Sequence, residues 1–134
     1  LQGSLPLLGL VAMQRLLDPR LIRPLFWLVA SMAVALALLP SASGPPPFPH
    51  ADKVQHCIAF ALMGALAWLG FPAAPGRLIF ERLALLGAGI EVFQSLPFVD
   101  RSVDVLDWAA DVTGAGLAIV IVAQLAPRLA RAPG

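Results

Sequence analysis

Four apolar runs, each close to the length that crosses a lipid bilayer, limit what this chain can fold into. They are residues 21–39, 54–71, 78–96 and 107–125. About 20 apolar residues in a helix span the hydrocarbon layer, and backbone amides in lipid must find their hydrogen bonds within the segment. With 59% hydrophobic and 13% charged residues, the chain has too little charge for a water-soluble surface. We therefore expect an all-α, multi-pass membrane protein with four transmembrane helices.

Basic residues are divided unevenly between the two ends of these runs. Short loops rich in lysine and arginine stay in the cytoplasm, so the end with more of them is expected there. That end has seven of the nine basic residues: Arg15, Arg20, Arg23, Arg77, Arg82, Arg128 and Arg131. The other end has Lys53 and Arg101. Both termini are therefore expected in the cytoplasm.

The length of 134 residues is that of a single domain. Residues 21–125 would hold the four helices, between an N-terminal segment (residues 1–20) and a cytoplasmic tail (residues 126–134). Part of the first segment is a candidate expression remnant, which would make Met13 the native start. Pro127 is expected to end the fourth helix, because proline disrupts a helix interior.

Polar side chains gather at the outer ends of the second, third and fourth runs. Ionisable groups within or beside a membrane span are rare and mark functional sites. This layer holds the acids Asp52, Glu91, Asp100, Asp104, Asp107 and Asp111, the bases Lys53 and Arg101, and His56, Gln94 and Ser102. Six carboxylates cannot all stay ionised away from water beside two permanent bases, so some should be protonated, ion-paired or bound to a cation. We expect a polar pocket that opens outward at the bilayer boundary.

Glycines lie one or two turns deeper than these polar groups, on the same helix faces. Gly64 follows His56, Gly87 precedes Glu91, and Gly114 follows Asp111. Small residues let transmembrane helices approach closely. We therefore expect the three helices to touch through these glycines and to separate outward around the pocket.

Three sequence blocks resemble the VanZ-like family of small bacterial integral membrane proteins. Residues 52–56 read Asp-Lys-Val-Gln-His and are followed by Phe60, and residues 91–94 read Glu-Val-Phe-Gln. Residues 101–107 read Arg-Ser-Val-Asp-Val-Leu-Asp, with Asp111 and Gly114 after them. The blocks match the order and spacing of the family's motifs over about half of the chain. The family has asparagine where this chain has Asp111, which adds a negative charge here.

The resemblance implies a multi-pass protein of the bacterial cytoplasmic membrane, and one family member is associated with resistance to the glycopeptide teicoplanin. The leading hypothesis is a pocket that recognises a lipid-linked or amphiphilic envelope molecule, affecting cell-envelope integrity or glycopeptide susceptibility. Arg101 and Lys53 would hold an anionic headgroup, since arginine suits bidentate contacts and lysine supplies a point charge. The candidate ligand-binding residues are Asp52, Lys53, His56, Glu91, Gln94, Arg101, Ser102, Asp104, Asp107 and Asp111.

Other readings remain open at this level. A membrane enzyme acting on a lipid headgroup would use His56 as base and Glu91 or an aspartate as acid. A proton- or cation-coupled transporter would use the intramembrane acids. A structural reading makes Lys53 and Arg101 neutralise the acids, with Asp104 and Asp107 capping the fourth helix.

No cofactor or metal is expected, with a divalent cation on His and carboxylates as the alternative. A net charge of +1 without a basic run argues against nucleic acid, and a homo-oligomer is compatible with the sequence.

Overall fold

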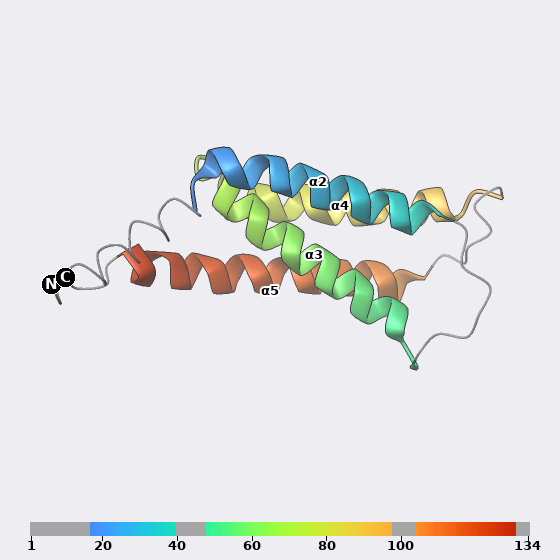
Figure 1. The fold of residues 1–134 in the computed structure, drawn as a ribbon. Helices are drawn as coiled ribbons and strands as arrows, with labels where there is room; N and C mark the ends of the chain where they lie inside the picture. Colours follow the sequence, from blue (N-terminus) through green and yellow to red (C-terminus); the bar gives the residue numbers. More distant parts are fainter. Residues whose placement is uncertain (1–16, 40–47, 98–103, 131–134) are drawn as a thin grey trace, which may run out of the picture.

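The computed structural model describes residues 17–39, 48–97 and 104–130, without the side chains of residues 127–130. Within these ranges the chain forms four helices and no strand (Figure 1): α2 (Pro19–Leu38), α3 (Ala51–Gly70), α4 (Gly76–Gln94) and α5 (Val105–Ala130). The all-α class and the order of the helices are as the sequence predicted. Each helix begins two or three residues before its apolar run.

Local chemistry explains where α2 and α3 begin. Asp18 precedes α2 and its carboxylate accepts a hydrogen bond from the backbone N–H of Arg20 at 2.9 Å. Pro19 in the first turn loses nothing there, since that N–H has no helical partner. α3 follows His50, which adopts the left-handed conformation with φ of 62°. This conformation is costly for a residue other than glycine, and it turns the chain sharply into α3.

The expected end of the fourth helix at Pro127 is wrong. α5 continues to Ala130. A proline inside a helix removes one backbone hydrogen bond and crowds the preceding turn, but it leaves the residues after it free to remain helical. The apolar segment of α5 that is suited to a membrane, Val105–Ala126, ends just before the proline.

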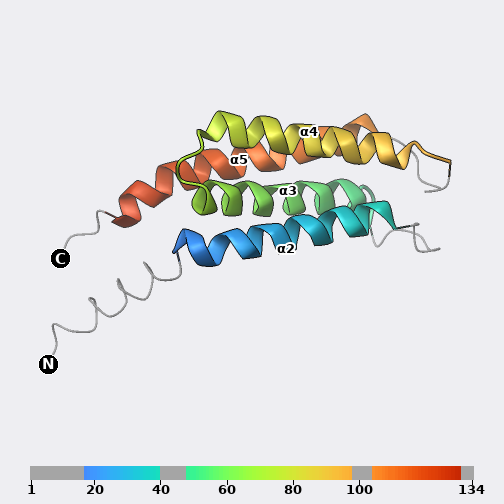
Figure 2. The same cartoon turned by 90° about the horizontal axis from the view of Figure 1, so that it is seen from above.

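The helices run back and forth with α3 at the centre of the bundle. α3 lies between α2 on one side and α4 and α5 on the other (Figure 2), and its most extensive contacts are with α5. The starts of α3 and α5 meet the ends of α2 and α4 at one end of the bundle (Figure 1). We call this the polar end, because it holds five of the seven acidic residues of the described chain: Asp52, Glu91, Asp104, Asp107 and Asp111.

Glycines bring the helices into backbone contact, as the sequence predicted. A Cβ atom at Gly64 would lie 2.9 Å from the carbonyl oxygen of Ala115, and one at Gly114 would collide with the carbonyl oxygen of Cys57. Gly87 of α4 provides the corresponding space for α5, since a Cβ there would lie 2.7 Å from Oδ2 of Asp111. α3, α4 and α5 are thus packed too closely at these levels for any larger residue.

Burial follows the pattern expected for a protein in lipid. Large apolar side chains point outward on every helix, with Leu85 72% and Leu28 63% exposed, whereas Asp111 is wholly buried and Gln94 is 3% exposed. In water, this exchange of polar and apolar positions would be strongly unfavourable. The outward face of the bundle therefore suits hydrocarbon.

Three of the helices are long and apolar enough to cross a membrane: Pro19–Leu38, Ala51–Gly70 and Val105–Ala126. The sequence predicted α4 as a fourth span, and α4 does not meet the same standard. Its 19 residues include four charged ones, Arg77, Glu81, Arg82 and Glu91. The coarse conclusion of a multi-pass membrane protein therefore rests on α2, α3 and α5.

Candidate functional site

Lys53, in the first turn of α3, holds three carboxylates together at the polar end. Its Nζ atom lies 2.6 Å from Oδ2 of Asp104, 3.0 Å from Oδ1 of Asp107 and 3.1 Å from Oδ2 of Asp52. The ammonium group has three N–H bonds, and each can be directed at one of these oxygens. The sequence placed Lys53 on an anionic ligand, but such contact would require one of the three ion pairs to open.

Asp104 stands immediately before α5 and caps it, as the structural reading of the sequence predicted. Its Oδ1 atom accepts a hydrogen bond from the backbone N–H of Leu106 at 2.8 Å, while its Oδ2 atom binds Lys53. The hydrogen bond from Lys53 is the main reason that the pKa of Asp104 is lowered from 3.8. Asp107, the other residue expected to cap, binds Lys53 instead.

Glu91 joins α4 to the beginning of α5. Its Oε2 atom accepts a hydrogen bond from the backbone N–H of Asp104 at 3.0 Å. In a capping box the acceptor of this N–H is a glutamate of the same helix. Here the acceptor is a glutamate of a neighbouring helix, α4. The start of α5 is therefore fixed by an acid from α4 and an ammonium group from α3.

His56 lies one turn deeper than Lys53 and is paired with a fully buried aspartate. Its Nδ1 atom lies 2.9 Å from Oδ1 of Asp111, and the two side chains are 14% and 0% exposed. Among the acids of this layer, Asp111 is the carboxylate that contacts the ring. A carboxylate on Nδ1 favours a proton there, which leaves Nε2 as the hydrogen-bond acceptor of the neutral ring.

Within the part of the chain that the structure describes, two buried carboxylate oxygens have no hydrogen-bond partner. They are Oε1 of Glu91 and Oδ2 of Asp111. A buried polar atom without a partner is uncommon and costly. The Asp111 oxygen faces the backbone of α4 at Gly87, one helical turn deeper than Glu91. Both helices thus present spare acceptors between α4 and α5.

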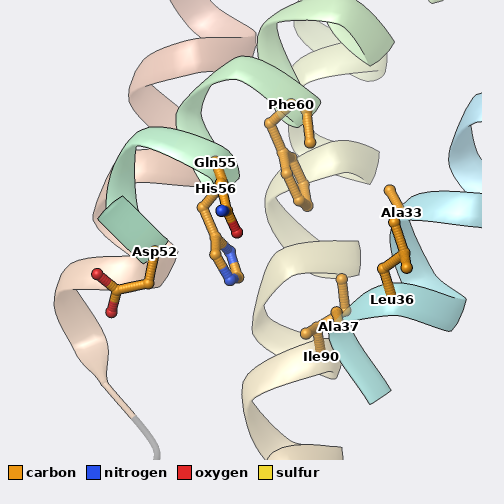
Figure 3. Close-up of a pocket in the computed structure, with 9 residues that line it drawn as sticks. Ala33, Leu36, Ala37, Asp52, Gln55, His56, Phe60 and Ile90 are labelled. Atoms are coloured by element: carbon orange, nitrogen blue, oxygen red, sulfur yellow. The ribbon is translucent and has the colours of Figure 1, made fainter. Parts of the chain in front are cut away.

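A pocket of about 390 Å³ opens beside His56, between α2, α3 and α4. His56 and Phe60 point from α3 into the space that faces Leu36 and Ala37 of α2 and Ile90 of α4 (Figure 3). Its lining is mainly apolar, and the polar side chains in it all come from α3. The lining residues are Ala33, Leu36, Ala37, Asp52, Gln55, His56, Ala59, Phe60 and Ile90. This mixture suits a molecule with an apolar body and a small polar group.

Of the expected ligand-binding residues that the structure describes, Asp52 and His56 line this pocket and the others do not. Gln94 is buried and donates from Nε2 to the backbone oxygen of Ala37 at 2.8 Å, so it ties α4 to α2. Ser95 donates to the carbonyl oxygen of Val92 at the end of α4. Arg101 and Ser102 lie outside the described residues. Asp52 lies at the edge of the pocket, away from the apolar side chains (Figure 3).

The carboxylates of Asp52, Asp104 and Asp107 could hold a cation by geometry alone, since one oxygen from each lies within 4.8 Å of the others. The Nζ atom of Lys53 is within hydrogen-bonding distance of all three. The ammonium group therefore already balances this cluster, and a divalent cation would have to displace it.

Two contacts at the site were not anticipated. Gln55 lines the pocket next to His56. It lies within the Asp-Lys-Val-Gln-His block, and its position beside His56 in that block could have indicated a place in the pocket. Trp108 donates from its indole nitrogen to the backbone oxygen of Ala84 at 2.9 Å and so joins α5 to α4. A tryptophan at the start of an apolar run carries no sequence signal that distinguishes such a bond from an interfacial anchor.

The chain was compared with protein-family models, with curated proteins and with solved structures, and no match was found in any of the three. The likeness to the VanZ-like family therefore rests on the motif residues of the sequence.

Proposed function

We propose that this chain is a VanZ-like protein of the bacterial cytoplasmic membrane whose outward-facing pocket binds a lipid-linked or amphiphilic molecule of the cell envelope. Through that binding it would affect envelope integrity or susceptibility to glycopeptides of the teicoplanin type. The observation that carries the proposal is the pocket beside His56, in which an apolar cleft ends at a histidine held by the buried Asp111.

The polar groups of this pocket select the chemistry of the ligand. Asp52 and Gln55 offer oxygen acceptors, and the Nε2 atom of His56 is an acceptor in the tautomer that Asp111 favours. Lys53 is engaged by three carboxylates. The pocket therefore suits hydroxyl or amino groups on an amphiphile better than a phosphate. An acylated glycopeptide, with a hydrocarbon tail and cationic groups, has this character.

In this proposal α4 is a fourth span, and both chain termini are cytoplasmic. Arg77, Glu81 and Arg82 lie in the first two turns of α4, where long side chains can reach the interface, and Glu91 is buried against α5 rather than in lipid. Single cysteines at Ala74 and Ser95, in a Cys57→Ser background, test this topology. An impermeant maleimide added to intact spheroplasts should label the cysteine at position 95 only, and labelling at 74 would overturn it.

Ligand binding is tested by filling the pocket. Leu36 lines it and is 60% exposed, whereas Met32, one turn earlier on α2, is 55% exposed and is not part of the lining. Leu36→Trp should therefore block the pocket, and Met32→Trp is the matched control. Teicoplanin and its deacylated form are titrated against each variant in phosphatidylcholine nanodiscs, and the lipids bound after gentle solubilisation are identified by native mass spectrometry.

We expect the unaltered protein and Met32→Trp to bind teicoplanin, or to retain a common envelope lipid, and Leu36→Trp to lose both. Equal binding and equal adducts in all three proteins would reject the proposed pocket. His56→Ala should weaken binding under conditions in which circular dichroism shows that the destabilised variant is still folded.

A membrane enzyme that acts on a lipid headgroup is the second candidate. The pairing of Asp111 with Nδ1 of His56 favours it, because this arrangement orients Nε2 as a general base. Ser95 is occupied at a helix end and Ser102 lies outside the described residues, so the nucleophile in this second proposal is water. Incubation of the protein with total bacterial lipid should then release headgroup fragments, and His56→Gln should abolish release without loss of lipid binding. No release by the unaltered protein would leave ligand binding as the function.

A further inference from the structure

A second groove lies at the opposite end of the bundle from the polar end. It has a volume of about 500 Å³ and runs between α2 and α4, over the end of α3. Its lining includes Phe26, Trp27, Phe71, Leu78 and Leu86, and the single charged residue in it is Arg82. The groove shares no residue with the pocket beside His56.

The polar groups of this groove are donors. Among the described residues, no carboxylate or carbonyl oxygen pairs with the guanidinium of Arg82, and none accepts from the indole N–H of Trp27, whose ring is packed edge-on against Phe26. Arg77, by contrast, is paired with Glu81 at 2.7 Å on the exposed face of α4. Arg82 is therefore the cation at this end that has both an apolar groove beside it and no counter-charge.

The depth of Arg82 suits a lipid headgroup. It lies six residues after the start of α4 at Gly76, which at ~1.5 Å per residue is about 9 Å along the helix. A long side chain at that level reaches the boundary between headgroups and hydrocarbon. The apolar lining continues inward from Arg82 to Leu86, so a chain attached to a phosphate at Arg82 would lie against these side chains.

We propose that the groove between α2 and α4 is a binding site for an anionic phospholipid, with an acyl chain against Phe26, Phe71 and Leu86 and the phosphate on Arg82. Basic residues beside grooves between membrane helices recognise such headgroups, and a guanidinium fits phosphate in a bidentate manner. Arg23 supports the rim, since its Nε atom donates to the backbone oxygen of Gly70 at 2.7 Å and its guanidinium lies 5.4 Å from the centre of the Phe71 ring.

The test compares lipid selectivity in nanodiscs of phosphatidylcholine with a minor fraction of phosphatidylglycerol. The protein is released in the mass spectrometer, and the ratio of the two lipids that stay bound is measured. Arg82→Gln should lower the phosphatidylglycerol ratio about fivefold, the change expected for one basic residue facing the headgroups. Arg77→Gln, which removes a charge that is already paired, should leave the ratio unchanged, and Arg82→Lys should restore part of it.

Each alternative result overturns the site. An unchanged ratio in Arg82→Gln means that the groove does not recognise the phosphate. An equal loss in Arg77→Gln means that general surface charge is responsible. Retention of the two lipids by the unaltered protein in the same proportion as in the nanodisc means that the groove has no headgroup preference. Leu36 does not line this groove. Leu36→Trp should therefore leave the lipid ratio unchanged, which separates this site from the pocket beside His56.

Discussion

The Nδ1 atom of His56 lies 2.9 Å from a carboxylate oxygen of Asp111, a residue with no exposed surface. The pair joins α3 to α5 on the polar-end side of the level at which Gly114 packs against Cys57. In water this contact would be an ordinary ion pair. Between membrane helices it decides both how α3 is rotated and which ring nitrogen faces the pocket.

The first prediction concerns the energetic coupling of this pair. His56→Ala and Asp111→Ala should each destabilise the fold, and the double variant should lose less than their sum, with an interaction free energy of about 1–3 kcal/mol. Denaturant titration of the solubilised protein, followed by circular dichroism, measures the free energy of unfolding of the unaltered protein, the two single variants and the double variant. Asp111→Asn is the conservative control, because its amide oxygen can still accept from Nδ1–H. Additive single effects would mean that the contact contributes nothing.

A second prediction separates close packing from helix propensity. Gly114→Ala should destabilise the protein by about 1–3 kcal/mol, since its methyl group would collide with the backbone of α3. At Gly89 of α4 no atom lies within 4 Å of an added Cβ, so Gly89→Ala should be neutral or stabilising by up to ~1 kcal/mol. Thermal unfolding of the two variants in one detergent makes the comparison, and equal effects would contradict the packing described here.

The third prediction exchanges the ammonium group of Lys53 for a metal ion. Lys53→Met leaves the carboxylates of Asp52, Asp104 and Asp107 without their shared partner, and oxygen atoms so arranged can bind Ca²⁺. Ca²⁺ should therefore raise the melting temperature of Lys53→Met and leave that of the unaltered protein unchanged. Adding Asp104→Asn to the variant should remove the response. A Ca²⁺ response in the unaltered protein would show that the ion competes successfully with the lysine.

Acid stability provides a fourth prediction. Bonding to Lys53 holds the pKa of Asp104 below 3.8 in the folded protein, so the contribution of this ion pair is complete above pH 3.8. It is lost as the pH falls below 3.8 through the lower folded-state value. Asp104→Asn keeps an oxygen for the N–H of Leu106 but removes the charge. The stability difference between the two proteins should shrink in that acid range, and a constant difference would argue against the pair.

The sequence predicted the helices and the gathering of polar groups well, because both depend on local pattern. Apolar run length placed α2, α3 and α5, and the spacing of Gly64, Gly87 and Gly114 from the polar groups predicted where the helices touch. α4 is the exception. Its apolar run lies between charged residues, and composition alone does not establish how such a helix meets the bilayer.

The partners within the polar layer could not be predicted from the sequence. A period of 3.6 residues places Glu91 and Gln94 on one face of a helix, but it does not fix the rotation of that face against two neighbours. Consequently the sequence did not show which of the acids would pair with His56, and Gln94 ties α4 to α2 instead of lining the pocket. The chain from 98 to 103, with Arg101 and Ser102, lies outside the described residues, and their part in binding stays a prediction.

The three walls of the pocket beside His56 are not equally anchored. α3 is fixed to α5 by Lys53, His56 and interlocking glycines, and α4 is fixed to α5 by Glu91 and Trp108. The bonds from Gln94 to Ala37 and from Arg23 to Gly70, which join α2 to its neighbours, end on neutral backbone carbonyls. Among the described residues no ion pair holds α2 to α3 or α4, and its apolar side chains Leu28, Met32 and Leu36 point outward. A tailed molecule could enter sideways, without leaving the bilayer, so that the membrane itself delivers the ligand.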